Sequence, residues 1–170
     1  MRWILDANSL IYLTRAGLTQ KFVDLADFQT VIDKEVYHEV VERGKDRNKP
    51  DSDQADQYLK TNNIPIIPVN IDRVIGHFKD PGEASCFVLA KSEGVCVTND
   101  IRAIKKFRAQ QVDAMPFEIF FGRRYREGRL PGAEFERILE ELVKANALTQ
   151  ERKIFTLKKN QDVLRGIRNE

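Results

Sequence analysis

Residues 80–100, DPGEASCFVLAKSEGVCVTND, constrain the fold more than any other stretch of this 170-residue chain. Asp80 is a good helix N-cap and Pro81 suits the first helical position, while Gly94 is expected to end the helix in a left-handed conformation. The run Val95–Thr98 is almost continuously apolar, which is typical of a parallel strand covered on both faces. The stretch therefore predicts a helix, then a buried strand that ends close to an aspartate.

The N-terminus repeats the second half of this pattern. Trp3–Leu5 is another short apolar run, and Asp6 follows it directly. Ligands of open α/β sheets bind beyond the carboxyl ends of the strands, so Asp6 and Asp100 would lie side by side there if their strands are parallel neighbours. Two close carboxylates repel each other unless a cation or a shared proton lies between them. The pair is therefore a first indication of a metal site.

Strand-like and helix-like segments alternate along the chain. Short apolar runs near residues 3, 31, 66, 97 and 113 are separated by helical patterns. Such alternation predicts a central parallel sheet of five strands with helices on both faces. Prolines favour an edge position for the strand Ile64–Val69, because proline cannot donate a ladder hydrogen bond. A short helix is expected at Ile71–Phe78, and a charged loop at Lys45–Ser52 is a candidate mobile flap beside the site.

Composition limits the class of protein. Hydrophobic residues make up 42% and charged residues 32% of the chain, as in globular domains. No apolar run approaches the roughly 20 residues of a membrane span, and the N-terminus does not resemble a secretory signal. Cys86 and Cys96 lie in core-like settings, which indicates buried free thiols in a reducing cytoplasm.

Positive charge gathers in one segment, although the net charge is only +2. Ile101–Arg129 carries eight Lys or Arg residues against three acidic residues, together with five aromatic ones. Such a segment suits a phosphate-backbone partner, and the alternative is a solvated face over ordinary core aromatics. The candidate nucleic-acid contacts are Arg102, Lys105, Arg123, Arg124 and Arg126.

Two further acidic residues lie on predicted helices. Glu39 lies more than one turn into a helix expected at Lys34–Arg43, which Gly44 is expected to stop. Taken alone, it is better interpreted as an exposed partner for Arg43 at i+4. Glu83 falls three residues after Asp80, where it can form a capping box with that residue instead of binding a ligand.

Taken together, these segments resemble the PIN-domain family. That family has Asp-x-Asn/Ser after its first strand and an acid on the helix after its second strand. It has another acid at the start of the helix before its fourth strand, and Thr-Asn-Asp after that strand. The chain has LDAN, HEVV, GEASCFVLA and VTND in those places. The resemblance covers roughly residues 1–120, and the tail is similar to that of a subfamily with extended C-terminal helices.

The resemblance implies a single domain over residues 1–170 with a three-layer α/β/α, Rossmann-like fold. Its core would span about 1–120, with a helical extension over about 121–170. It also implies a cytoplasmic hydrolase, a Mg²⁺- or Mn²⁺-dependent endoribonuclease for single-stranded RNA. Hard oxygen ligands suit these ions, so the residues agree with this chemistry.

The resemblance also assigns roles to individual residues. Its acidic quartet falls on Asp6, Glu39, Glu83 and Asp100. Asp6 and Asp100 would bind the metal directly, and Glu83 would bind it directly or through water. Glu39 would orient a water or complete the site. The polar accessory positions are Asn8, Thr98 and Asn99.

Other functions remain open at this stage. One alternative is an inactive relative that binds RNA or a protein without cleavage. Another is a flavodoxin-like nucleotide- or phospho-receiving domain, which lacks support because no glycine-rich phosphate loop follows a strand. As a nuclease, the chain is expected to be the toxin of a type II toxin–antitoxin pair, with an RNA-processing enzyme as the alternative.

The last two predicted helices carry apolar faces that must be buried. The first has the stripe Phe135, Ile138, Leu139, Leu142 and Val143, and the second has Ile154, Phe155 and Leu157. An exposed patch of this size would mark an interface. We therefore expect a homodimer or an antitoxin groove on the Phe135–Val143 helix. The alternative is that both helices dock within the same chain.

Overall fold

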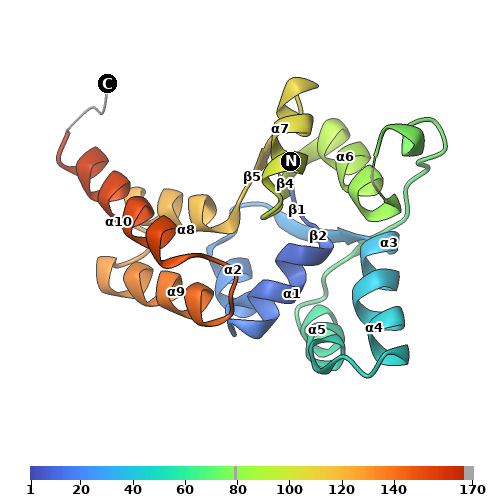
Figure 1. Cartoon of the computed structure of the whole chain (residues 1–170), viewed down its shortest axis with the longest axis horizontal. Helices are drawn as coiled ribbons and strands as arrows, with labels where there is room; N and C mark the ends of the chain where they lie inside the picture. Colours follow the sequence, from blue (N-terminus) through green and yellow to red (C-terminus); the bar gives the residue numbers. More distant parts are fainter. Residues whose placement is uncertain (79, 167–170) are drawn as a thin grey trace.

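The computed structural model describes residues 1–78 and 80–166 and has an α/β architecture (Figure 1). Its strands are β1 Arg2–Leu5, β2 Gln29–Asp33, β3 Ile66–Ile67, β4 Gly94–Val97 and β5 Ala114–Met115. They pair in parallel in the order β3-β2-β1-β4-β5. The predicted five-stranded parallel sheet is confirmed, and the proline-flanked strand lies at its edge as expected.

Helices cover both faces of this sheet, so the predicted three-layer architecture is confirmed. In Figure 1, α1 and α5 lie on one side of the sheet, and α6 and α7 lie on the other. The helices up to β5 are α1 Ala7–Arg15, α2 Thr19–Leu25, α3 Lys34–Tyr37, α4 Arg43–Asp46, α5 Pro50–Thr61, α6 Pro81–Glu93 and α7 Ile101–Ala109. No helix in the described part of the chain combines the length and the apolarity needed to cross a membrane.

The central strands β1 and β4 end at the same edge of the sheet. Leu5 lies opposite Val97, and the backbone N–H of Asp6 continues the ladder with a 3.2 Å hydrogen bond to the carbonyl oxygen of Val97. Both strands are buried on both faces, which explains their continuous apolar runs. This register places the residues that follow β1 beside those that follow β4.

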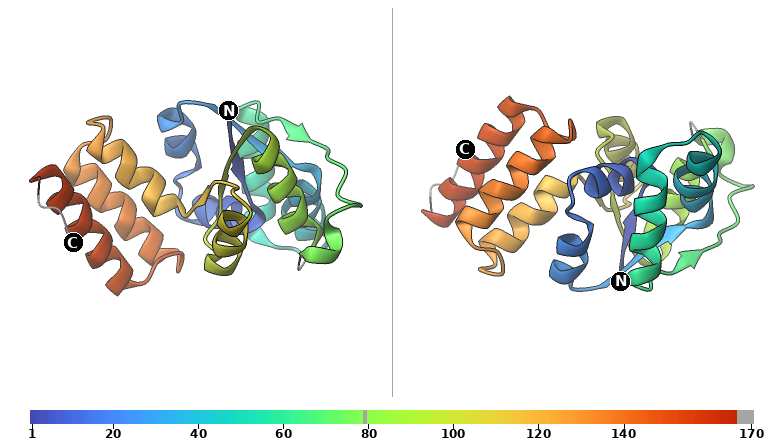
Figure 2. Two further views of the ribbon diagram at one scale, coloured as in Figure 1. Left: turned by 90° about the horizontal axis from the view of Figure 1, so that it is seen from above. Right: turned by 90° about the horizontal axis from the view of Figure 1, so that it is seen from below.

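The C-terminal extension adds three helices beside the sheet, α8 Phe117–Arg126, α9 Gly132–Lys144 and α10 Gln150–Leu164. Both views of Figure 2 show them side by side, away from the helices that cover the sheet. Phe120 of α8 packs against Phe22 and Trp3, with ring centroids 4.2 Å and 5.0 Å away. The extension is therefore joined to the sheet domain by a shared aromatic core.

The apolar face of α9 is buried within the chain. Phe135, Ile138, Leu139 and Leu142 are at most 1% exposed. This face cannot form the expected homodimer or antitoxin groove, because the chain itself already covers it. The structure instead agrees with the alternative, in which α9 docks within the same chain.

On α10, two of the three apolar residues that were expected to be buried are exposed instead. Ile154 and Phe155 are 58% and 66% exposed, whereas Lys153, Thr156 and Asn160 are the buried residues of this helix. Gly122 explains the close approach of α8 and α10, because a Cβ at that position would lie 2.9 Å from the Asn160 side chain. Polar contacts therefore replace the expected apolar face.

Two glycine predictions are wrong. Gly94 does not end α6 in a left-handed conformation; its φ is −163°, and it begins β4. A Cβ there would lie 2.4 Å from the backbone oxygen of Arg2, so the residue must be small where β4 passes β1. Gly44 does not stop its helix either, because α4 runs on to Asp46.

Two connecting segments also differ from expectation. The expected loop Lys45–Ser52 is mostly helical, because α4 ends at Asp46 and α5 already begins at Pro50. The helix expected at Ile71–Phe78 shortens to the 3-10 turn Ile75–His77.

Candidate active site

Five acidic side chains line one hollow of about 70 Å³ at the carboxyl edge of the sheet. We call it the acidic hollow, and its acids are Asp6, Glu39, Asp80, Glu83 and Asp100. The quartet expected from the family resemblance therefore lies together, with Asp80 as a fifth acid. Asp80 was expected only as a helix cap. Asn8 and Thr98 also line the acidic hollow, whereas Asn99 lines a neighbouring one.

Asp6 and Asp100 are held in place because each caps the helix that follows its strand. Oδ1 of Asp6 accepts a hydrogen bond from the backbone N–H of Ser9 at 2.7 Å. Oδ1 of Asp100 accepts from the backbone N–H groups of Arg102 at 2.7 Å and Ala103 at 3.2 Å. Helix capping thus fixes both carboxylates at the edge where β1 and β4 end.

The carboxyl group of Asp6 has a raised pKa. The pKa of Asp6 is raised to about 6, mainly by burial and least by the charge of Asp100, while hydrogen bonds from Thr98 and Ser9 oppose the shift. The Thr98 hydroxyl oxygen also accepts a 3.1 Å hydrogen bond from the backbone N–H of Asp100. Thr98 therefore contacts the carboxyl group of Asp6 and the backbone of Asp100. A cation beside Asp6 would favour its ionised form.

Glu39 reaches the acidic hollow from a π-helical segment, His38–Glu42, inserted between α3 and α4. Such a segment changes which side chains face inward, and its occurrence could not be read from the sequence. Oε2 of Glu39 lies 3.4 Å from the point that a Cβ on Gly82 would occupy. The absence of a side chain at the start of α6 thus makes room for this carboxylate.

Glu83 lies in the first turn of α6 and contacts α7. Its backbone N–H donates a 2.8 Å hydrogen bond to Oδ1 of Asp80, as expected for an Asp80 cap. Its own carboxylate pairs with Nζ of Lys106 at 3.1 Å. Lys106 was missed by sequence reasoning, which expected a role for Lys105 of the same basic helix.

The floor of the acidic hollow is apolar and includes the two cysteines. Cys86 of α6 and Cys96 of β4 are buried and free, as expected. The hydrogen bond with Cys96 and burial raise the pKa of the Cys86 thiol well above its usual value. The thiols are therefore neutral packing groups and not nucleophiles.

The donor set of the acidic hollow fits a hard divalent cation. In the part of the chain that the structure describes, no three or more His, Cys, Asp or Glu side chains are placed to hold a metal ion together. Mg²⁺, however, takes one or two protein carboxylates and fills its other positions with water and substrate oxygens. Asp6 and Asp100, which repel each other without a cation, fit this requirement. Glu83 fits it less well because it already pairs with Lys106.

The expected RNA contacts on α8 are partly incorrect. Arg124 is 1% exposed, and its guanidinium pairs with Asp27 at 2.8 Å and Glu127 at 2.5 Å, so it is not available to a phosphate. Arg126 donates a hydrogen bond to Oδ1 of Asn160 on α10. The exposed members of the expected set are Arg102, Lys105 and Arg123.

A second and larger hollow, of about 410 Å³, adjoins the acidic one. Glu39, Asp80 and Gly82 line both. We call it the basic hollow because its walls include the cationic residues Arg15, Arg43, Arg47 and Lys49. The sequence predicted Arg43 at the end of a helix and Arg47 and Lys49 in a mobile flap beside the site, but it assigned them no role in binding.

Comparison with known families identifies the domain that contains the acidic hollow. A family model described as a PIN domain matches residues 2–113, which include all five acids of the acidic hollow. PIN domains are in general nucleases and typically use divalent metal ions. Comparisons with curated proteins and with solved structures gave no match. On the family match, this chain belongs to the PIN-domain family.

Proposed function

We propose that this protein is a divalent-metal-dependent endoribonuclease that cleaves phosphodiester bonds in single-stranded RNA. The observation that carries the proposal is the gathering of Asp6, Glu39, Glu83 and Asp100 around one hollow at the carboxyl edge of the sheet. In a family that consists in general of nucleases, such a set supports hydrolysis of a phosphodiester.

Asp6 and Asp100 would hold Mg²⁺ or Mn²⁺, and Glu83 would contribute directly or through water. Such an ion, when bound, lowers the pKa of a coordinated water and offsets charge that builds on the phosphate. Glu39 would accept a hydrogen bond from the attacking water. Thr98, which contacts both aspartates, would keep their oxygens oriented. Lys106 would place a positive charge beside the phosphate.

The test is cleavage of a 5′-labelled single-stranded RNA by the purified protein. We expect cleavage with Mg²⁺ or Mn²⁺, none with EDTA, and a loss of at least 100-fold in Asp6→Asn and Asp100→Asn. Asp113→Asn is the matched control, because this exposed residue lies before β5, at the opposite end of the strands. Metal-independent cleavage, or full activity in Asp100→Asn, would contradict the proposal.

An inactive relative that binds RNA without cleavage is the alternative, and the same assay decides it. RNA binding without cleavage under any divalent metal would favour that alternative. The intact set of carboxylates around the acidic hollow favours the enzyme.

Within the nuclease function, we propose a toxin of a type II toxin–antitoxin pair that acts on cytoplasmic RNA. The alternative is an RNA-processing enzyme. A toxin should arrest growth when it is expressed alone, and a small neighbouring gene should restore growth. An RNA-processing enzyme would need no such partner. The expected homodimer stays a prediction, without the α9 face, and sedimentation of the pure protein tests it.

A further inference from the structure

The basic hollow presents three cationic side chains on one concave surface. Arg43, Arg47 and Lys49 are exposed, and none of them forms an ion pair with any residue that the structure describes. Arg15, which also lines the basic hollow, differs in this respect because it pairs with Asp51 at 2.6 Å. Unpaired cations that share one concave surface attract an anionic ligand.

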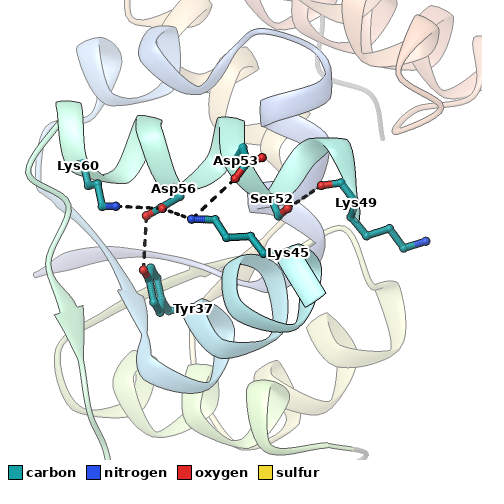
Figure 3. A network of polar contacts seen from close by, with 7 residues as sticks. All are labelled: Tyr37, Lys45, Lys49, Ser52, Asp53, Asp56 and Lys60. Carbon is teal, nitrogen blue, oxygen red and sulfur yellow. Dashed lines mark hydrogen bonds and ion pairs between the residues drawn. The ribbon is translucent and has the colours of Figure 1, made fainter. Parts of the chain in front are cut away.

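These cations stand on a folded hairpin of helices. Figure 3 shows the network of polar contacts between α4 and α5, in which Lys45 pairs with Asp56. The Asp56 carboxylate also accepts a 3.0 Å hydrogen bond from Lys60. The Ser52 hydroxyl donates to the backbone oxygen of Lys49 at 2.5 Å. In the figure the Lys49 ammonium points away from this network.

Close packing supports the same hairpin. A Cβ on Gly44 would lie 2.8 Å from Cβ of Ser52, so α4 and the start of α5 approach each other directly. Asn48 takes the left-handed conformation, with φ 52°, that turns the chain between the two helices. The hairpin therefore holds the backbone of all three cationic residues beside the hollow, before any ligand binds.

The basic hollow opens onto the candidate catalytic carboxylates. Glu39, Asp80 and Gly82 belong to both walls, so a ligand in the basic hollow would be continuous with one in the acidic hollow. The two acids that line both hollows, Glu39 and Asp80, belong to the acidic hollow. Of the remaining acids that line the basic hollow, Asp51 is paired with Arg15, and Glu35 lies on α3.

From these observations we infer that the basic hollow binds the phosphate backbone of the single-stranded RNA that enters the acidic hollow. Arg43, Arg47 and Lys49 contact successive phosphates, and the apolar side chains of Ile11 and Val40 form the adjoining wall. This inference rests on the proposed ribonuclease function and assigns its substrate path. It places the RNA on the α4–α5 side of the site and not on the basic end of α8.

The experiment compares two triple variants that remove the same charge. The first is Arg43→Gln, Arg47→Gln, Lys49→Gln. The control is Arg123→Gln, Arg129→Gln, Lys158→Gln, three exposed cations of the C-terminal region that form no ion pair with described residues. Binding of a fluorescent ten-nucleotide single-stranded RNA is measured in EDTA by anisotropy over a range of KCl concentrations.

We expect the first triple variant to lower the slope of log affinity against log salt by about 2, because each lost phosphate contact removes about 0.7. The control should change the slope by less than about 0.5. The charge-conserving variant Arg43→Lys, Arg47→Lys, Lys49→Arg should restore most of the slope. Circular dichroism excludes unfolding as the cause.

The possible failures are distinguishable. If the wild type cleaves RNA and the first triple variant keeps its slope, or the control loses as much, the substrate path is overturned while the proposed function stands. If the wild type neither binds nor cleaves RNA, the proposed function fails, and the path fails with it.

Discussion

Asn99, two residues beyond the end of β4, donates a hydrogen bond from Nδ2 to the backbone oxygen of Ala147 at 2.5 Å, across 48 positions of the chain. Ala147 lies in the connection between α9 and α10, well beyond the family match, which ends at residue 113. A hollow of about 270 Å³ lies at this junction, and Asn8, Asp100 and Asn146 are among its lining residues. The extension is therefore fastened directly beside the candidate catalytic residues.

Removal of this tether should loosen the extension locally. Asn99→Ala leaves a buried backbone oxygen without its donor, which we expect to lower the free energy of unfolding by about 1–2 kcal/mol. Hydrogen exchange of residues 145–149 should become faster. Asn62→Ala is the control, because Asn62 Nδ2 donates to the backbone oxygen of Tyr58 within its own helix end. Unchanged exchange at 145–149 in Asn99→Ala would show that the contact does not restrain the loop.

The raised pKa of Asp6 predicts a specific dependence of stability on pH. Because the folded-state pKa of about 6 exceeds the usual 3.8, the folded protein binds this proton more tightly than the unfolded chain does. The stabilisation is fully present below about pH 4 and is lost as the pH rises through 6, by up to about 3 kcal/mol.

Asp6→Asn removes this titration and keeps a residue that caps helices well. In EDTA, urea unfolding should show the variant more stable than the wild type at pH 7.5 and about equally stable near pH 4. The difference should disappear between these values. Asp113→Asn, on an exposed carboxylate, should follow the wild-type profile. Equal stability of Asp6→Asn and the wild type at every pH would contradict the assigned cause.

The sheet and the positions of Asp6 and Asp100 were predictable because their pattern is local. Trp3–Leu5 and Val95–Val97 are buried on both faces, so the sequence reads as uninterrupted apolar runs, and Asp6 and Asp100 follow them at once. Parallel pairing of the two strands then brings the aspartates to one edge. No knowledge of side-chain packing is needed for that step.

Other features depend on contacts between distant segments. Arg124 looks like its exposed neighbour Arg123 in sequence, and only the pairing with Asp27, 97 positions away, buries it. The π-helical segment that presents Glu39 has no sequence marker that we recognised. The polar face of α10 packs on α8 through Asn160, which an apolar periodicity cannot reveal.

Metal binding should stabilise the folded protein. A cation that binds the native state alone adds about 2.7 kcal/mol at 100 times its Kd, which corresponds to a rise in Tm of about 5–10 °C for a chain of this size. We expect this rise with Mg²⁺ or Mn²⁺ at pH 7.5. Asp100→Asn should abolish it, and Asp113→Asn should keep it. No rise in the wild type at millimolar metal would argue against the site.

We predict that Arg124 stabilises the folded protein and does not contact RNA. Its guanidinium is buried between Asp27 and Glu127 and lies 4.9 Å from the centroid of the Phe120 ring. The Asp27 carboxylate also accepts a 2.9 Å hydrogen bond from Nε1 of Trp3. Arg124 therefore links α8 to β1 and to the segment before β2.

Arg124→Ala removes the charge partner of two acids and leaves a cavity in the aromatic core. We expect the free energy of unfolding to fall by on the order of 3 kcal/mol, measured by urea denaturation. Arg123→Ala, one position earlier and exposed, should change it by less than about 0.5 kcal/mol. At a temperature where both variants are folded, their RNA affinity should match that of the wild type. A stable Arg124→Ala variant with weakened RNA binding would reverse this assignment, because it would require the guanidinium to reach the RNA.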